Sequence, residues 1–333
     1  MKTMHVQRPG MLTTLQDLGR FGHQQYGVSV NGPMDEWSHR LANALVGNPE
    51  DAAVLECTLG GPSLSFSQSV LIALCGARMR VTADGQPVPY GRAILLRRGV
   101  VLDIGERIDG ARVYLAVRGG LGPEPVLGSR STNLRAGFGG YHGRALKGGD
   151  RVPLCAVSQE LRALPIDRRM VQSGLPMLSV LPVDVTPPLR PTDALRFIPG
   201  PQWSAFTDQA RMDIKGQPYQ ITPQSDRMGI RLGGPALMLE QPMELVSEAT
   251  AFGTLQVPPD GQPIVLMADR QSAGGYPKIG YVVSADLPVL AQAMPGDMLR
   301  FVVVTQAEAE DSWQAFEDRL QQIRMAAVQA LKQ

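Results

Sequence analysis

Short apolar runs, each bounded by turn-forming residues, constrain most strongly what this chain can fold into. Runs at 80–83, 111–117 and 299–304 contain β-branched residues, mainly valine, and the chain carries 36 glycines and 27 prolines. Valine and other β-branched residues pack well on a pleated strand, whereas glycine and proline end strands in turns. We therefore expect a mainly β protein with few helices, built from sandwiches or barrels.

Helical spacing of apolar residues occurs in two segments. In residues 33–46 the apolar side chains lie three or four positions apart, which predicts a helix with Pro33 in its first turn and Asn31 or Gly32 as the cap. Residues 307–331 carry one apolar stripe with charged residues opposite. We expect this C-terminal helix either to lie across a barrel or to form a contact between protein chains.

Two glycine motifs recur in the same order and at nearly the same offset. Residues 60–64 read Gly-Gly-Pro-Ser-Leu and residues 233–237 read Gly-Gly-Pro-Ala-Leu. Likewise, Asp-Gly-Gln-Pro-Val at 84–88 returns as Asp-Gly-Gln-Pro-Ile at 260–264. The repetition predicts an internal duplication.

A chain of 333 residues has the length of about two domains, at ~150 residues each. The proline-rich stretch 181–191 is the expected connection. We therefore expect a first domain at 1–185, which carries the helical insertion, and a second at 192–333, which ends in the C-terminal helix. Strands could be exchanged between them.

Composition excludes several classes of function. A net charge of +1 with dispersed charges argues against nucleic-acid binding, and no apolar run approaches the ~20 residues of a membrane span. The N-terminus has no apolar core of a secretory signal, and three cysteines without metal-ligand spacing predict a reduced, cytoplasmic protein. There is no P-loop, and the four histidines are too scattered to predict a metal site.

Polar chemistry is concentrated after the strand-like run 263–268. An acid, an amide, a phenol and an amine lie within ten positions around two adjacent glycines, which let backbone N–H groups approach a ligand. These residues are Asp269, Gln271, Gly274, Gly275, Tyr276 and Lys278. The alternative is a turn or bulge with solvated side chains.

Three other places carry candidate residues, each with a structural alternative. Asp35 and Asn43 lie in the first predicted helix, where Asp35 could serve only the helix dipole and Asn43 is expected to bond to backbone or ligand. Arg227 could clamp a carboxylate, or form a local ion pair with Asp226. The glycine-rich region 127–144 could bind an anion, or be a mobile surface loop. Its candidate donors are Arg130, Ser131 and Arg144.

Taken together, these stretches resemble the family of 5-oxoprolinase C subunits, also called allophanate hydrolase subunit 2, which is related to the carboxyltransferase region of urea carboxylase. The matching stretches appear in family order and cover about residues 5–305. They are Gln16–Arg20, Gly32–Asp35, Ala42–Asn48, Leu127–Thr132, Pro199–Gln202, Ser225–Gly229, Gln256–Pro258 and Asp269–Pro277. One departure is Ser272-Ala273, where the family usually has threonine and a second small residue.

The resemblance implies two cyclophilin-like β-barrels and two partners, the kinase-inhibitor-like B subunit of the enzyme together with its A subunit. The assembled enzyme would use ATP to open the lactam of 5-oxo-L-proline to L-glutamate. Phosphorylation of the lactam oxygen would supply a leaving group and explain the ATP requirement. Since the chain has no P-loop, its ATP site would be atypical or shared with a partner. Biotin is not expected, because the chain has no Met-Lys-Met biotinylation site.

Two other functions stay open. One is a carboxyltransferase acting on a urea-like amide, and the other is a non-catalytic regulator of the kinase-inhibitor-like partner. For the 5-oxoprolinase we expect the site between the two halves. Asp35, Asp269 and Lys278 are its expected catalytic residues. The expected substrate-binding residues are Asn43, Arg227, Gln271, Gly274, Gly275 and Tyr276.

Overall fold

The computed structural model describes residues 2–157, 177–179 and 194–332. Contacts divide the chain into two compact units, each described here by itself. Unit 1 comprises residues 1–20, 35–189 and 319–333, and unit 2 comprises 21–34 and 190–318. Each unit is thus assembled from separate stretches of chain. The expected connection at 181–191 lies outside the described residues.

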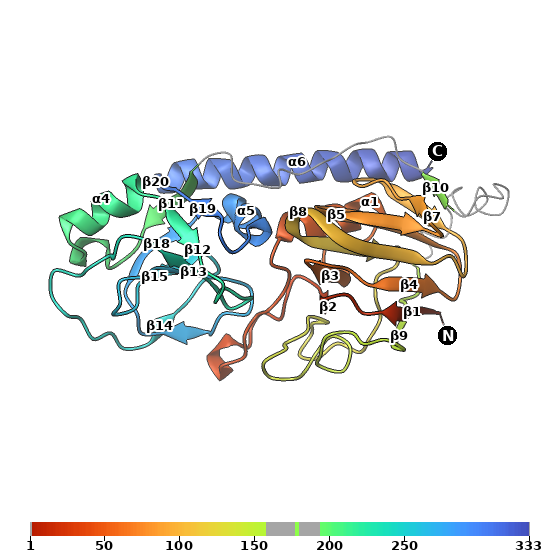
Figure 1. Ribbon diagram of the computed structural model, residues 1–333, viewed down its shortest axis with the longest axis horizontal. Coiled ribbons are helices and arrows are strands. Elements are labelled where there is room, and N and C mark those ends of the chain that lie inside the picture. The colour runs from red at the N-terminus through yellow and green to blue at the C-terminus, as the bar shows by residue number, and fades with distance from the viewer. Residues whose placement is uncertain (1, 158–176, 180–193, 333) are drawn as a thin grey trace. The chain divides into compact units, whose positions relative to one another are not determined.

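Unit 1 is built on one large antiparallel sheet (Figure 1), in which strand order runs β10-β7-β5-β8-β4-β1-β9 and β2 joins through β3. Its strands are β1 (Thr3–Arg8), β2 (Leu12–Gln16), β3 (Val54–Thr58), β4 (Ser63–Phe66), β5 (Val70–Ala83), β6 (Gln86–Pro87), β7 (Ala93–Leu96), β8 (Leu102–Val117), β9 (Arg151–Pro153) and β10 (Met177–Ser179). The long pair β5 and β8 forms its centre, with register shifts beside Gly76, whose φ of 98° favours glycine.

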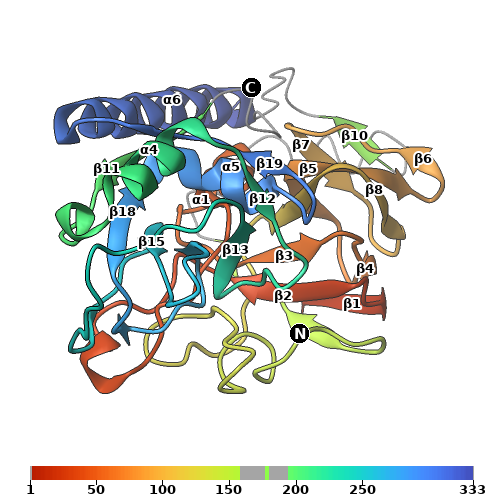
Figure 2. The same cartoon turned by 60° about the vertical axis from the view of Figure 1, so that its left-hand side comes forward.

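Unit 2 contains an eight-stranded sheet in the order β19-β12-β13-β16-β15-β18-β11-β20, and a separate two-stranded ribbon of β14 and β17. Figures 1 and 2 both show β15, β18 and β11 side by side. The strands are β11 (Leu195–Pro199), β12 (Tyr219–Ile221), β13 (Gly229–Gly233), β14 (Glu248–Ala249), β15 (Thr254–Gln256), β16 (Ile264–Leu266), β17 (Ala273–Gly274), β18 (Lys278–Val282), β19 (Met298–Leu299) and β20 (Phe301–Val303).

Helices are few among the described residues, as the sequence predicts. The α-helices there are α1 (Glu36–Leu45), α4 (Asp208–Gly216), α5 (Leu287–Gln292) and α6 (Gln306–Lys332), and the short 3₁₀ turns are η1 (Gln24–Tyr26), η2 (Trp203–Ala205) and η3 (Ser284–Asp286). The sheets curve into a half-barrel and a nearly closed barrel, so the prediction of a mainly β, two-barrel chain with a C-terminal helix is confirmed. Among the described residues, no helix has both the length and the apolar character needed to cross a membrane.

The last part of α6 covers unit 1, to which its residues from Arg319 onward belong. Leu320 and Leu331 are 1% exposed and join a buried cluster with α1 and the strand residues of β5 and β7. The full stripe on this part of the helix consists of Leu320, Ile323, Ala327 and Leu331. Here the predicted apolar stripe packs on unit 1 rather than on the second half of the chain, and this packing accounts for its burial.

The first helix begins later than expected. Asp35, in an extended conformation, is the N-cap of α1, and its carboxylate accepts from the Ser38 backbone N–H at 2.8 Å and from the Ser38 hydroxyl at 2.6 Å. The expected cap at Asn31 or Gly32 is therefore wrong. Both of those residues have positive φ, 59° and 96°, which turns the chain before the helix can begin.

Both Asp-Gly motifs of the proposed duplication occupy turns between antiparallel strands. Asp84 and Gly85 join β5 to β6, and Asp260 and Gly261 lie between β15 and β16. Asp84 itself has a φ of 46°, a conformation that aspartate tolerates better than most residues. Shared turn chemistry agrees with a duplication, which stays a prediction.

Candidate functional site

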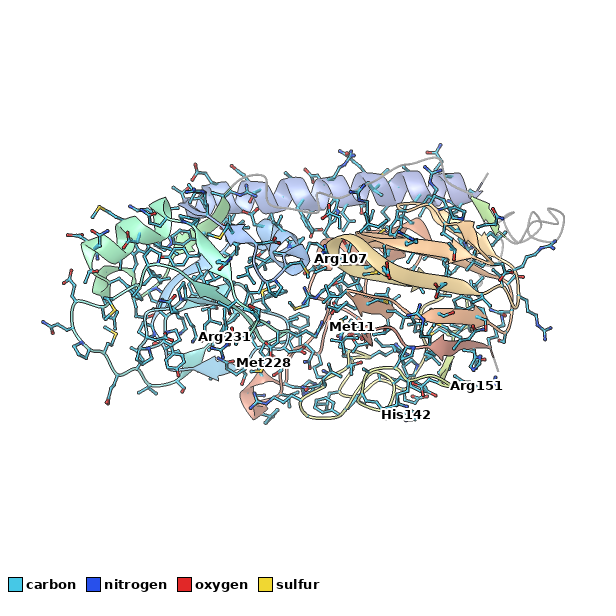
Figure 3. The ribbon with its side chains drawn as sticks, viewed as in Figure 1. Met11, Arg107, His142, Arg151, Met228 and Arg231 are labelled. Atoms are coloured by element: carbon cyan, nitrogen blue, oxygen red, sulfur yellow. The ribbon has the colours of Figure 1, made fainter. Side chains whose placement is uncertain are left out.

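Arg227 and Asp269 meet at one edge of the unit 2 sheet because their strands are paired. Arg227 lies two residues before β13, which begins at Gly229, and next to Met228, which Figure 3 labels. Asp269 lies three residues after the end of β16. These strands pair antiparallel, with Gly229 opposite Leu266. The Asp269 N–H donates to the Arg227 carbonyl at 2.8 Å, which continues the ladder past the strands.

The side chains form a bidentate pair. Arg227 Nε lies 2.9 Å from Asp269 Oδ2, and Arg227 Nη2 lies 3.1 Å from Oδ1. Two groups from the turn before α1 complete the network: Asn31 Nδ2 donates to Asp269 Oδ1 at 2.7 Å, and Arg227 Nη2 donates to the Gly32 carbonyl at 2.7 Å. With side-chain exposures of 7% and 12%, the charges are largely withdrawn from water. Such a planar arrangement holds a carboxylate in one orientation.

The ion pair expected between neighbours Asp226 and Arg227 is replaced by this longer connection. The Asp226 carboxylate instead accepts the backbone N–H groups of Met228 at 2.8 Å and Gly229 at 3.2 Å, and so shapes the turn into β13. That use of aspartate is common in turns. The strand pairing, which a local sequence pattern does not reveal, decides the partner of Arg227.

A second polar cluster lies on β15 and β18. Lys278 is 2% exposed, and its Nζ contacts Glu248 Oε2 of β14 at 2.6 Å. Its backbone N–H donates to Gln202 Oε1 at 3.0 Å. Gln256 stands opposite Lys278 in the strand register and is 1% exposed. A buried lysine and a buried amide thus share one face of the sheet.

Gln271 and Gly274 complete this cluster. Gln271 Nε2 lies 3.5 Å from Gln256 Oε1, at the long limit of a hydrogen bond. A Cβ at Gly274 would lie 2.8 Å from Gln256 Nε2 and 3.2 Å from Gln271 Nε2. The absence of a side chain at Gly274 therefore lets the backbone approach both amides, which would have to shift to make room for a Cβ. Within the described part of the chain, Gln256 Nε2 has no hydrogen-bond partner.

Tyr276 and Gly275 line an apolar pocket of about 610 Å³ in unit 2. The Tyr276 side chain is 47% exposed, and a Cβ at Gly275 would lie 3.0 Å from the Leu245 carbonyl. The pocket walls are mostly leucine, methionine and proline: Leu237, Met238, Leu239, Pro242, Met243, Leu245, Pro258, Pro259 and Pro277. Tyr276 thus faces a different surface chemistry from that of the buried lysine and amides.

Asp35 and Asn43 are buried in unit 1 with partners inside the protein. Besides its cap bonds, Asp35 offers its backbone N–H to the Tyr114 hydroxyl at 2.8 Å. Asn43 Nδ2 donates to the Ala52 carbonyl at 2.8 Å, and its Oδ1 accepts from Asn48 at 3.0 Å. The backbone bond expected for Asn43 is confirmed. Since these two residues belong to unit 1 and the others to unit 2, a site that unites them stays a prediction.

The expected anion-binding residues also have partners within unit 1. Arg144 forms a bidentate pair with Asp150 at 2.8 and 2.9 Å, which holds the pKa of that carboxyl below its usual value. Ser131, fully buried, donates to Asp17 Oδ1 at 2.7 Å, and Arg130 Nε donates to the Pro123 carbonyl at 2.8 Å. These donor atoms are thus already bonded to Asp150, Asp17 and Pro123, and anion binding by this region stays a prediction.

Gln256, Glu248 and Gln202 are site residues that the sequence analysis of single motifs missed. Gln256 and Gln202 each belong to a stretch that matched the family, Gln256–Pro258 and Pro199–Gln202, and those matches were the signals available for them. Glu248 and Gln202 lie 30 and 76 positions from Lys278, and only the folded chain brings them together.

Comparison with known proteins agrees with the sequence resemblance. The family model for the carboxyltransferase domain, subdomain A and B, matches residues 26–303. The chain is 38% identical over 311 residues to the C subunit of the Haemophilus influenzae 5-oxoprolinase, covering 93% of this chain and 94% of that one. It is 37% identical over 316 residues to the C subunit of the Escherichia coli 5-oxoprolinase, covering 95% of each.

Solved structures show the same relationship. The K. lactis urea amidolyase superposes with a TM-score of 0.83 at 31% identity, and the match covers 96% of this chain and 20% of that one. The whole of this chain therefore corresponds to one part of a much longer enzyme. The chain has a carboxyltransferase-type domain, which is also found in urea amidolyase. On these matches, it belongs to the family of 5-oxoprolinase C subunits.

Proposed function

We propose that this chain is the C subunit of an ATP-dependent 5-oxoprolinase, which opens 5-oxo-L-proline to L-glutamate together with its A subunit and its kinase-inhibitor-like B subunit. The observation that carries the proposal is the near full-length identity of 37–38% to two 5-oxoprolinase C subunits. Because the chain has no P-loop, ATP would bind at an atypical site or at one shared with a partner.

The two polar clusters of unit 2, one around Lys278 and one around Asp269, carry the chemistry that a lactam with a carboxylate requires. Lys278 supplies a buried cation for the carboxylate, and the amides of Gln256 and Gln271 can donate to the lactam carbonyl. Asp269, fixed by Arg227, is a carboxylate of defined orientation that can accept the lactam N–H. A site of fixed donors and acceptors rejects ligands that lack the matching groups.

Reconstitution tests this proposal. The chain is purified with and without the candidate A and B partners, and ADP release that depends on 5-oxo-L-proline is measured. Lys278→Ala and Asp269→Ala should each lower turnover by ~10²-fold or more, because each removes a group expected to act on the substrate. Lys215→Ala and Asp318→Ala, both at exposed positions, are the matched controls.

Asp269→Asn guards against a trivial result. Removing the Asp269 side chain leaves Arg227 buried without its anion, which can cost ~3–5 kcal/mol and unfold the protein. Asparagine also removes the charge, but it keeps the shape and one hydrogen-bond acceptor for Arg227, so it should disturb the fold less than alanine. Near wild-type turnover in Lys278→Ala and Asp269→Asn, with both variants folded by circular dichroism, would reject the site assignment.

A second candidate is a carboxyltransferase acting on a urea-like amide. The observation in its favour is that the matching family model describes a carboxyltransferase domain, and that urea amidolyase of Saccharomyces cerevisiae is 32% identical over 90% of this chain. A biotinylated carrier domain that co-purifies with the chain and loses its carboxyl group to urea would favour this function. ADP release that requires 5-oxo-L-proline and no carrier would favour the first.

A further inference from the structure

Lys278 and Gln256 form a buried polar floor beneath the β14–β17 ribbon. The two residues are direct partners across β15 and β18, so their side chains project from the same face. Both are at most 2% exposed. An ammonium and an amide N–H₂ side by side are two donors that a single small molecule can engage.

The ribbon lies directly on this floor. Glu248 of β14 pairs with Gly274 of β17, and the ribbon joins neither of the two larger sheets among the described strands. Gly274 lies against the Gln256 amide so closely that a Cβ would lie 2.8 Å from Nε2. At Gly274 the ribbon therefore approaches the Gln256 amide with no side chain between, while Glu248 extends from the paired strand to Lys278.

Glu248 is the anion that pairs with the buried Lys278 ammonium. Its carboxylate reaches Lys278 Nζ at 2.6 Å, yet the Glu248 side chain is 49% exposed while that of Lys278 is 3% exposed. Residues 241–244 and 246–249 of the same stretch are exposed, so few packing contacts hold this carboxylate in place. A buried ammonium must be paired, but any carboxylate of suitable reach can pair with it.

The side-chain amide of Gln256 has a donor group without a hydrogen-bond partner among the described residues. Its Oε1 faces Gln271 Nε2, whereas its Nε2 has no partner among the described residues. An unpaired buried amide donor is uncommon in folded proteins and calls for an acceptor. The carbonyl oxygen of a bound amide would supply one.

We propose that Gln256 and Lys278 form a receptor for a small molecule that carries a carboxylate and an amide carbonyl, and that Glu248 holds the carboxylate position until such a ligand displaces it. This inference rests on the proposed function, since it names how the same site would recognise a lactam carboxylate. Because Glu248 leaves only when another carboxylate replaces it, Lys278 is never left without an anion.

Isothermal titration of the full chain with three probes separates the two contacts. The probes are 5-oxo-L-proline, L-proline, which has the carboxylate but no lactam carbonyl, and 2-pyrrolidinone, which has the carbonyl but no carboxylate. Glu248→Gln removes the competing carboxylate. It should raise the affinity for 5-oxo-L-proline and L-proline about tenfold or more, and leave 2-pyrrolidinone unchanged. Glu244→Gln, an exposed position in the same stretch, is the control.

Gln256→Met keeps the length of the side chain and removes the donor. It should lower the affinity for 5-oxo-L-proline and 2-pyrrolidinone roughly three- to tenfold, the effect of one hydrogen bond, and leave the affinity for L-proline unchanged.

If Glu248→Gln is too unstable to titrate, its melting temperature is measured with added sodium acetate. Acetate should raise that temperature more than it raises the wild type's, because it restores an anion to Lys278.

The outcomes distinguish this inference from the proposed function. If Glu248→Gln and Glu244→Gln bind all three probes equally, the displacement is rejected even where the assembled enzyme turns over 5-oxo-L-proline. If the gain appears for L-proline while 5-oxo-L-proline is neither bound nor turned over, the displacement stands and the proposed substrate is wrong.

Discussion

His39 should make the stability of this protein fall as the pH drops below neutral. The residue lies on α1, is fully buried, and its Nε2 is 3.3 Å from the Gln16 carbonyl. Burial lowers its pKa from 6.5 to about 4, against the opposing effects of Asp17, the Gln16 carbonyl and Glu56 and with a smaller lowering from Arg40. The folded state therefore holds a neutral imidazole, whereas the unfolded chain protonates below 6.5.

Proton binding to His39 in the folded and unfolded states sets the sign and size of the change in stability with pH. Above pH 6.5 neither state binds the proton, and this source of stability is fully present. As the pH falls from 6.5 toward 4, the unfolded state gains the proton first and stability is lost. A pKa of about 4 in place of 6.5 corresponds to about 3 kcal/mol in full, at ~1.36 kcal/mol per pKa unit, of which about 2 kcal/mol is lost by pH 5.

Urea unfolding at pH 7.5, 6 and 5 measures the effect in wild type and in His39→Gln. Carboxylates titrate in both proteins, so the difference between the two profiles isolates the histidine. Wild type should lose about 2 kcal/mol more than His39→Gln between pH 7.5 and pH 5. His23→Gln, at a partly exposed position without a side-chain cap bond, should follow the wild type. Parallel profiles for wild type and His39→Gln would refute the argument.

Two further substitutions test buried contacts. Tyr114→Phe removes the hydroxyl that donates to Glu56 Oε2 at 2.7 Å and accepts the Asp35 N–H, so it should lower the free energy of unfolding by about 1–3 kcal/mol in urea titrations. Gly274→Ala places a methyl 2.8 Å from Gln256 Nε2 and should lower turnover of the reconstituted complex, while Gly216→Ala, which meets open space, should not. An unchanged free energy of unfolding in Tyr114→Phe would contradict the first expectation, and unchanged turnover in Gly274→Ala would contradict the second.

The sequence predicted element types well where a pattern is local. Runs of β-branched residues bounded by turn residues indicated the strands, and the apolar stripe indicated α6. Strand lengths were harder: the run 80–83 proved to be the end of the long strand β5, which starts at Val70 and continues past Gly76, because Gly76 lies at a bulge rather than at an end. The start of α1 was misplaced for a related reason, since the backbone conformation of Asn31 and Gly32 decides it.

Candidate site residues were predicted by type, but their partners were not. The segment 269–278 stood out through its chemistry, and Arg227 through its charge. That Arg227 meets Asp269 follows from the pairing of β13 with β16, a contact across 42 positions that no local pattern encodes. A polar residue in a short strand such as Gln256 carries no signal of burial in a single sequence, because alternation would equally place it toward solvent.

The same limit explains why the buried lysine became interpretable only in the folded chain. As a sequence feature, Lys278 is one amine near two glycines. In the fold its position opposite Gln256 makes it part of a floor, and the ribbon that carries Gly274 also brings Glu248 to its ammonium. A half-exposed carboxylate paired with a buried cation is an exchangeable contact, since the charge that must stay paired is the lysine's and the partner is free to change.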